Sequence, residues 1–311
     1  MIPVKQLKQG DRVSLAAPAR AIQFSEISDF LDLARNEWGL EVEVDDALFS
    51  LDHQFAGDDA TRLAVLQKTL DDPGIKAVFC CRGGYGTARL LGSLDLTAFR
   101  EQPCWVIGYS DITALHALLN RQGIESIHAM MPFTYRSSHP LSKASAESLH
   151  MALFRQPEAY HFPPHELNVS GQAEGELIGG NLSVIYSLQA TPWQYEPGGR
   201  ILFLEDVDEY LYHIDRMMMN LRDSGFLEGL AGLVVGYMTD IHDNETPFGR
   251  DACRIIADAV KQYGYPVGFG FPAGHQDPNH ALIIGRKISL DVSAGGSTLG
   301  IYPPDHRSFR K

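Results

Sequence analysis

Cysteine is scarce in this sequence, and long apolar runs are missing. The four cysteines, Cys80, Cys81, Cys104 and Cys253, stand in apolar surroundings with no spacing that would suit a zinc site. In a chain of 311 residues they are typical of reduced, buried positions in a cytosolic protein. No stretch approaches the roughly 18 apolar residues of a membrane span, and the N-terminal segment lacks the apolar region of a secretion signal. We therefore expect a cytoplasmic protein without disulfides and without a membrane partner.

Basic residues are also under-represented. Lysine and arginine together number 26 against 39 aspartates and glutamates, which gives a formal net charge of −13. A surface with this balance repels phosphate backbones, so the sequence argues against a nucleic-acid partner. With 44% hydrophobic and 21% charged residues, the composition is that of a folded globular protein, which excludes disorder over most of the length.

Strand-like and helical segments alternate in the first half of the chain. Apolar residues with helical periodicity separate the strands, for example over Ile112–Gly123. The segment Lys76–Cys81 is apolar on both faces, as a buried parallel strand is. This alternation predicts an open, mostly parallel α/β sheet covered by helices. The predicted strands are Val13–Pro18, Leu40–Val44, Lys76–Cys81 and Cys104–Gly108.

The alternation stops at Gln156–Gly175, a proline-rich segment without clear periodicity. Segments of this kind are typical of domain boundaries. We therefore predict an N-terminal domain at 1–160, a linker at 161–175 and a second domain at 176–311.

Strands dominate the second half of the chain. Ile201–Glu205 and Leu230–Met238 look like buried strands, with a helical segment between them. Ala281–Val292 and Thr298–Tyr302 look like an antiparallel pair. The second domain is therefore expected to be α+β or barrel-like, and the chain as a whole is α/β in class.

A glycine-rich loop, Arg82–Gly86, follows the strand Lys76–Cys81 directly. Consecutive glycines permit positive φ angles and leave backbone N–H groups open to an anion. A dinucleotide-binding loop would need a further glycine where Arg89 stands, and the Gly-Lys-Ser/Thr of a P-loop is missing. No cofactor is therefore expected. A tight turn without chemistry is the alternative interpretation of this loop.

A second candidate is the run Gly108, Tyr109, Ser110 and Asp111, between a predicted strand and a predicted helix. A serine at such a sharp turn is raised above the sheet, with a helix N-terminus beside it that can stabilise an oxyanion. The Gly-x-Ser pattern resembles a nucleophile elbow, although Ile112 replaces the second glycine. The alternative is that Ser110 or Asp111 only caps the helix.

A serine nucleophile needs a base and a group that orients the base. Among twelve histidines, His275 stands out because it follows a glycine-flexed loop at a predicted strand end. Glu205 ends an apolar strand, where a partly desolvated carboxylate can hold an imidazole. The sequence therefore offers a base and an orienting group for Ser110.

Two other interpretations of these acids are open. The acids after the strand could form a solvated loop without a role in chemistry. They could also bind a metal, with ligands drawn from Glu205, Asp206, Asp208, His275 and His280. Because no compact ligand spacing supports that site, no metal is expected.

Six motifs, in order along the chain, resemble those of the LD-carboxypeptidase family. These serine peptidases trim cell-wall tetrapeptides, and the family includes the microcin-immunity peptidases. The motifs are FAGDDATRL, CRGGYGTARLL, IGYSDITAL, GELIGGNLSVI, ILFLEDVDE and GFPAGH. The resemblance implies a Rossmann-like N-terminal domain, a smaller β-rich C-terminal domain and a homodimer.

The resemblance also implies which residues act. Ser110 matches the family's nucleophile, His275 its base and Glu205 the residue that orients the base. The donors to the oxyanion would be the backbone N–H groups of Asp111 and Gly84.

The substrate implied by the resemblance is a murein tetrapeptide, from which D-alanine is released during cell-wall peptide recycling. The terminal carboxylate of that peptide needs a cation, and Arg82 is one candidate. One alternative is a hydrolase of acyl-nucleotide or peptide-nucleotide conjugates, as in the microcin-immunity branch. The other is a non-catalytic protein that binds a peptide between its domains.

Overall fold

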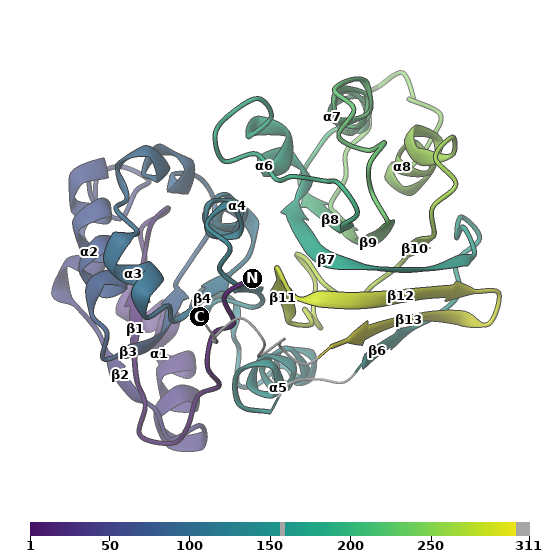
Figure 1. Cartoon of the computed structure of the whole chain (residues 1–311). Coiled ribbons are helices and arrows are strands. Elements are labelled where there is room, and N and C mark those ends of the chain that lie inside the picture. The colour runs from purple at the N-terminus through teal and green to yellow at the C-terminus, as the bar shows by residue number, and fades with distance from the viewer. Residues whose placement is uncertain (156–158, 303–311) are drawn as a thin grey trace.

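The computed structural model describes residues 1–155 and 159–302, which form two β-sheets with helices packed around them (Figure 1). One sheet has six strands and the other has seven. The N-terminal half of the chain supplies all but one strand of the first sheet, and the remainder of the chain supplies the second.

The first sheet is the mostly parallel sheet that the sequence predicts. Its strands are β1 (Arg12–Ala16), β2 (Glu41–Glu43), β3 (Ile75–Cys80), β4 (Trp105–Gly108), β5 (Ser126–His128) and β11 (Leu282–Ile284). They lie in the order β11-β5-β4-β3-β1-β2, with β1 to β5 parallel and β11 antiparallel to β5. The accompanying helices are α1 (Phe24–Asp32), α2 (Asp59–Asp71), α3 (Thr97–Glu101), α4 (Thr113–Arg121) and α5 (Pro140–Phe154).

Burial explains why the central strands of this sheet could be predicted. Every residue of β4 is buried, and so is every residue of β3 except Lys76. Strands covered by helices on both faces need apolar side chains on both faces. The helix α4 is buried from Thr113 to Asn120 because it lies between the two sheets (Figure 1).

The second sheet is mixed. Its strands are β6 (Ala159–Phe162), β7 (Gly171–Asn181), β8 (Ile201–Val207), β9 (Gly232–Thr239), β10 (Val267–Phe269), β12 (Lys287–Ser293) and β13 (Gly296–Ile301). They lie in the order β10-β9-β8-β7-β12-β13-β6. The strands β7 to β10 are parallel, and β12, β13 and β6 extend the sheet antiparallel from β7. The helices α6 (Leu182–Ser187), α7 (Leu211–Asp223) and α8 (Ala252–Val260) lie beside the parallel strands (Figure 1).

The second sheet curls so that its two edges approach each other. Val169, in the connection between β6 and β7, forms a bridge with Val267 of β10, the opposite edge strand. The rings of Phe162 in β6 and Phe271 just after β10 have centroids 5.4 Å apart. This curvature encloses an apolar interior, which agrees with the barrel-like character expected for the second half of the chain.

The segment Ala281–Val292 is expected from the sequence to form one continuous strand, but the structure divides it in two. It divides at Gly285, which has φ of 88°, into β11 and β12. The strand β11 joins the first sheet while β12 joins the second, so the C-terminal part of the chain contributes to both sheets. Arg286 at the division forms a buried, two-pronged ion pair with Glu125 at 2.5 and 2.6 Å.

The segment expected to be a linker also contains regular structure. The strand β6 reaches Phe162, and β7 begins at Gly171. Their partners β13 and β12 come from more than a hundred residues further along the chain, so local periodicity carries little signal of this pairing. The division of the chain into domains at 161–175 stays a prediction.

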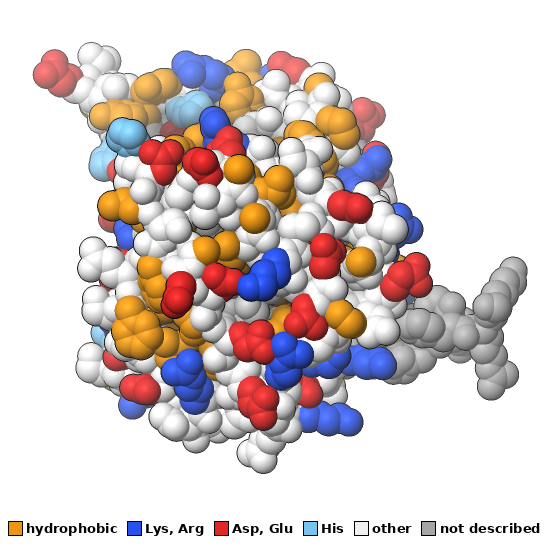
Figure 2. Space-filling model, turned by 90° about the vertical axis from the view of Figure 1, so that its left-hand side faces the viewer, with side chains coloured by type: hydrophobic (Ala, Val, Ile, Leu, Met, Phe, Trp, Pro, Cys, Tyr) orange, Lys and Arg blue, Asp and Glu red, His pale blue; other side chains and the backbone are white. Residues whose placement is uncertain are grey.

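The predicted nucleophile, Ser110, follows β4 of the first sheet, and the predicted acid, Glu205, lies near the carboxyl end of β8 in the second sheet. The helix α4 lies between the two sheets (Figure 1). On the face in Figure 2, acidic and basic side chains are interspersed rather than gathered by sign. No helix in the described ranges has the length and apolar character that a membrane span requires.

Candidate active site

Ser110 lies on a strained turn at the end of β4. A short 3-10 turn, Ser110–Ile112, joins β4 to α4, and Ser110 itself has φ of 64°. A positive φ is uncommon for a residue other than glycine and marks a backbone that the surroundings hold in place. A Cβ on Gly108 would lie 2.9 Å from the Ile112 side chain, so the turn needs glycine at that position. The geometry is that of a strand-to-helix elbow that presents a serine.

The glycine loop packs directly against this elbow. A Cβ on Gly83 would lie 2.9 Å from Ser110 Cβ, 3.1 Å from Ser110 Oγ and 3.4 Å from the backbone nitrogen of Asp111. Only glycine permits so close an approach. Within the described residues, the N–H groups of Gly83 and Gly84 donate no hydrogen bond. They are therefore available to an oxygen atom bound above Ser110.

The side chain of Asp111 joins the loop to the elbow. Its Oδ2 accepts a hydrogen bond of 2.8 Å from the backbone N–H of Thr87, just after the glycine loop. The carboxyl group is buried, and this burial raises its pKa. Asp111 thus has a structural role through its side chain, in addition to the oxyanion role predicted for its backbone N–H.

Glu205 and His275 are in contact. The Nδ1 of His275 lies 2.6 Å from Oε2 of Glu205. Glu205 lies near the carboxyl end of β8 and is 0% exposed. His275 lies on the loop after β10, and the preceding Gly274 has φ of 126°. A Cβ on Gly274 would lie 2.9 Å from Glu205 Oε2. The glycine therefore lets the loop bring the imidazole down onto the acid.

The ion pair decides the protonation behaviour of His275. Burial alone would lower the pKa of the imidazole, but the charge of Glu205 and the hydrogen bond to it outweigh burial. The pKa of His275 is consequently raised above its ordinary value. The remaining ring nitrogen, Nε2, is the atom that can exchange a proton with a nucleophile.

Tyr109 connects the nucleophile's turn to the base. Its ring centroid lies 4.8 Å from that of His275, and its side chain is only 7% exposed. Since Tyr109 directly precedes Ser110, this contact brings the elbow next to the imidazole. The Ser110 hydroxyl makes no hydrogen bond within the described residues, and such bonds commonly form only when substrate is bound. No role for Tyr109 is predicted from the sequence, although an aromatic side chain beside a candidate nucleophile is a usable signal.

A hydrogen-bond network links the two sheets behind these residues. The backbone N–H of Asn181, at the end of β7, donates to Oγ1 of Thr113 in α4 at 3.0 Å. A Cβ on Gly180 would lie 2.4 Å from the same Oγ1, so glycine permits the approach. The side chain of Asn181 donates to Asp206 at 2.8 Å, and Asp206 directly follows Glu205. Thr113 thereby ties the helix after Ser110 to the strand that carries Glu205.

Asp206 is held by this network rather than by solvent. Its carboxylate accepts hydrogen bonds from the Asn181 side chain and from the backbone N–H groups of Ser183 and Val207. Burial, reinforced by the charge of Glu205, raises its pKa to about 7. The GGN sequence before α6 belongs to the motif GELIGGNLSVI, but only the structure reveals its contact with α4.

Thr113→Val is expected to lower kcat about 10-fold with little change in KM. Valine has the shape of threonine without the hydroxyl, so the buried N–H of Asn181 loses its acceptor and the sheets lose their fixed alignment. Thr113→Ser keeps the hydroxyl and should retain most of the activity. Steady-state kinetics of both variants test this prediction, and equal kcat values for the valine and serine enzymes would contradict it.

Arg82 makes two contacts at the edge of the site. Its Nη1 lies 3.4 Å from Oε1 of Glu26, and its guanidinium stacks 3.9 Å from the ring centroid of Phe133. A role for Arg82 in substrate binding stays a prediction.

The side chains considered as metal ligands do not converge. Asp206 faces Asn181, while Asp208 pairs with His242 at 2.6 Å, away from the Glu205–His275 pair. Among the residues that the structure describes, no group of three or more His, Cys, Asp or Glu side chains could hold a metal ion.

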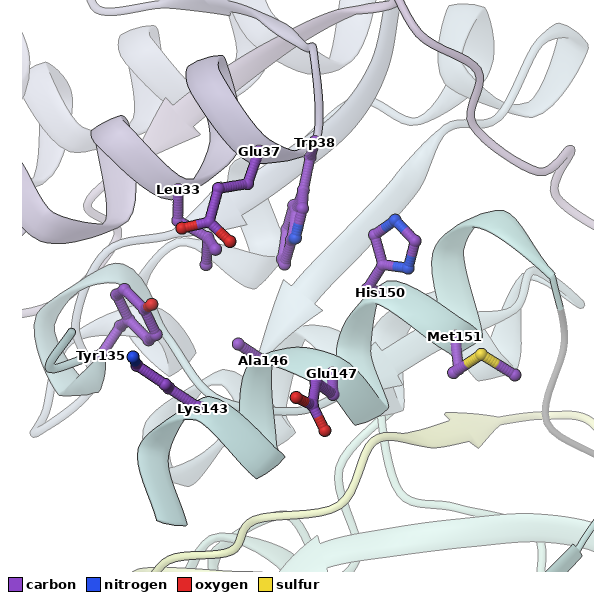
Figure 3. Close-up of a pocket in the computed structure, with 9 residues that line it drawn as sticks. All are labelled: Leu33, Glu37, Trp38, Tyr135, Lys143, Ala146, Glu147, His150 and Met151. Carbon is purple, nitrogen blue, oxygen red and sulfur yellow. The ribbon is translucent and has the colours of Figure 1, made fainter. Parts of the chain in front are cut away.

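A cavity of about 520 Å³ lies away from these residues (Figure 3). It opens between the turn after α1 and the helix α5, with Glu37 and Trp38 on one side and Lys143, Glu147 and His150 on the other. Neither Ser110, Glu205 nor His275 lines it.

Comparison with known proteins identifies the family of this chain. Residues 13–129 match the model of the LD-carboxypeptidase N-terminal domain, and residues 174–290 match that of the C-terminal domain. A probable murein peptide carboxypeptidase of Bacillus subtilis is 36% identical over 301 residues, covering 93% of this chain and 91% of the relative.

Solved structures agree as well. The muramoyltetrapeptide carboxypeptidase of Oxalobacter formigenes superposes with a TM-score of 0.84 at 26% identity, covering 94% of this chain and all of that chain. The structure of MccF in complex with glutamyl sulfamoyl guanosine has the same fold, with a TM-score of 0.84 at 20% identity over 96% of this chain and 98% of that one. The chain therefore belongs to the LD-carboxypeptidase family of peptide hydrolases.

Proposed function

We propose that this enzyme is a serine LD-carboxypeptidase that releases the terminal D-alanine from murein tetrapeptides. The observation that carries the proposal is the buried Glu205–His275 pair. Tyr109, the residue before Ser110, contacts the imidazole, so the pair lies next to the strained turn that carries Ser110. The names of the relatives, murein peptide carboxypeptidase and muramoyltetrapeptide carboxypeptidase, support the same substrate class.

The mechanism follows from the roles of these groups. His275 Nε2 takes the proton of the Ser110 hydroxyl as Oγ bonds to the carbon of the scissile amide. The N–H groups of Asp111 and Gly84 hold the resulting oxyanion, and Glu205 stabilises the imidazolium. When the tetrahedral intermediate collapses, the C–N bond breaks and His275 gives its proton to the leaving D-alanine. Water, deprotonated by His275, then cleaves the acyl-enzyme and restores Ser110.

In the proposed substrate, the scissile amide joins the L-centre of meso-diaminopimelate to the terminal D-alanine. Peptides that differ in the stereochemistry at this bond therefore test the proposal. The protein should release D-alanine from a synthetic murein tetrapeptide, and chromatography or mass spectrometry would detect both products. An all-L peptide should stay intact. A peptide linked to a nucleotide through a sulfamoyl group is tested in parallel. If that conjugate were cleaved faster than the tetrapeptide, the protein would be a hydrolase of peptide-nucleotide conjugates instead. Binding of the tetrapeptide without turnover would indicate a non-catalytic peptide-binding protein.

The pH dependence of kcat/KM offers a further prediction. Neutral His275 is the active base, and its pKa is raised by Glu205, so activity is lost at low pH where the imidazole is protonated. We expect kcat/KM to rise with pH through an apparent pKa above the ordinary value of about 6.5. A profile that is flat between about pH 5 and about pH 9 would contradict a titrating imidazole.

The assembly and location of the enzyme follow from the family resemblance. We expect a homodimer in the cytoplasm, where recycled murein peptides would be its substrates. Light scattering at concentrations that give full specific activity tests the dimer, and a mass of about 34.4 kDa, that of one chain, would contradict it. Cell fractionation tests the location.

A further inference from the structure

Arg20 lies beside the glycine loop on a fixed backbone. It follows β1, and its own N–H donates to the carbonyl of Gly83 at 3.4 Å. The neighbouring residues are bonded to the segment at Phe55: Ala21 donates to Gln54 at 2.9 Å, and Arg20 itself forms a bridge with Phe55. The main chain at Arg20 is therefore held against both the glycine loop and the adjacent loop.

The side chain of Arg20 crosses Gly84. A Cβ on Gly84 would lie 2.5 Å from Cδ and 2.7 Å from Nε of Arg20, so only glycine leaves room for it. The side chain is exposed, and within residues 1–155 and 159–302 its guanidinium makes no ion pair, no hydrogen bond and no aromatic stacking. A cation with all of its donors available thus borders the loop that contacts Ser110.

The other arginine of this loop differs in its surroundings. The guanidinium of Arg82 forms an ion pair with the Glu26 carboxylate at 3.4 Å and stacks 3.9 Å from the ring centroid of Phe133. Part of its charge is therefore balanced within the protein. Glu26 also accepts a hydrogen bond of 2.7 Å from the N–H of Gln23, as the cap of α1. Binding a substrate carboxylate at Arg82 would therefore compete with the Glu26 carboxylate, whereas Arg20 has no such competitor among the described residues.

We infer that Arg20 binds the terminal carboxylate of the substrate's leaving residue, an inference that rests on the proposed carboxypeptidase function. In such a substrate the carboxylate lies one residue beyond the scissile carbonyl, and one extended residue spans roughly 3.3–3.6 Å. Gly83 contacts Ser110, and the next residue, Gly84, contacts Arg20, so the loop spaces nucleophile and cation by one residue. A guanidinium can bind a carboxylate through two parallel hydrogen bonds.

Arg20 is thereby a specificity-determining residue for peptides with a free carboxyl end. The carboxylate is bound equally in the ground state and the transition state, so its loss raises KM and leaves kcat nearly unchanged. We expect Arg20→Ala to raise KM for the tetrapeptide about 30-fold. Arg20→Lys, which keeps the charge but not the two-pronged geometry, should recover part of the loss.

The test compares the tetrapeptide with its C-terminal amide, measured as release of D-alanine or D-alaninamide. The wild-type enzyme should prefer the acid about 30-fold in kcat/KM, and Arg20→Ala should bring the ratio near one. Arg35→Ala removes an exposed arginine from the π-helical turn Leu33–Glu37 that follows α1, and it serves as the matched control, with the acid preference retained.

The outcomes separate this inference from the proposed function. Suppose that the wild-type protein releases D-alanine and that Arg20→Ala keeps the wild-type ratio of kcat/KM between the acid and the amide. This result would leave the proposed function in place and overturn the role of Arg20. Loss of the ratio in Arg82→Ala instead of Arg20→Ala would also overturn it and would assign the carboxylate to Arg82. A wild-type protein that cleaves neither peptide would overturn the proposed function, and the inference with it.

Discussion

Replacing Ser110 with alanine is expected to lower kcat for D-alanine release at least about a thousandfold. The change removes one oxygen atom, the one that would form the bond to the scissile carbonyl carbon. Backbone N–H groups and substrate contacts would persist, so a residual rate and a nearly unchanged Kd for the peptide are expected. His275→Ala should cause a loss of similar size, since without the imidazole no group accepts the serine proton. Rapid-quench measurement of D-alanine checks both variants.

Controls separate loss of chemistry from loss of folding. The variants should keep the wild-type circular dichroism spectrum and a comparable Tm. Ser293→Ala, which removes a hydroxyl from the turn between β12 and β13, should leave kcat unchanged. Treatment with a chelator should have no effect on the wild-type enzyme. Near-normal turnover by Ser110→Ala would rule out the serine mechanism, and inhibition by the chelator would favour a metal-dependent one.

Glu205→Gln is expected to reduce kcat about 10³- to 10⁴-fold. The carboxylate accepts the Nδ1–H of His275 at 2.6 Å and is fully buried, so it fixes the tautomer and the ring orientation of the base. A neutral amide provides no charge to stabilise the imidazolium formed during the reaction. The pKa of His275 should also fall, because the charge that raises it is gone. The pH profile of the residual activity should accordingly shift to lower pH.

A second glutamate–histidine pair provides the matched control for this variant. Glu209 lies 2.6 Å from Nδ1 of His213, at the start of α7, and the described residues show no contact of this pair with Ser110 or His275. Glu209→Gln should therefore leave kcat and its pH profile unchanged. If both glutamine variants lowered kcat equally, or if Glu205→Gln kept the wild-type pH profile, the role assigned to Glu205 would be wrong.

The parts of the fold that the sequence predicts are those specified by local burial. The strands β3 and β4 are apolar on both faces, and the apolar residues of α4 recur with helical periodicity, so the sequence pattern identifies these elements. The strand β11 could not be separated from β12, because the choice of sheet depends on partners far away in the chain. The polar beginning of β7 likewise gains strand geometry only through its pairing with β12.

The same distinction applies to the site. Ser110 and Glu205 lie near the carboxyl ends of β4 and β8, and His275 lies on the loop after β10. Each stands within a motif, so residue type and position together mark it as a candidate. The structure brings Glu205 and His275 into contact and packs Tyr109, which directly precedes Ser110, against the imidazole. Thr113 and Arg20 could not be found in this way. Thr113 accepts a hydrogen bond from Asn181, and the Arg20 side chain lies against Gly84. Both contacts depend on how distant segments of the chain pack together.

A covalent probe tests the central claim most directly. The probe is a tetrapeptide analogue in which an aryl phosphonate ester replaces the scissile amide, and peptide mapping by mass spectrometry locates the adduct. We expect one phosphonyl group per chain on Ser110, formed much more slowly in His275→Ala and not at all on that peptide in Ser110→Ala. Complete loss of D-alanine release with Ser110 unmodified would contradict the assignment of Ser110 as the nucleophile.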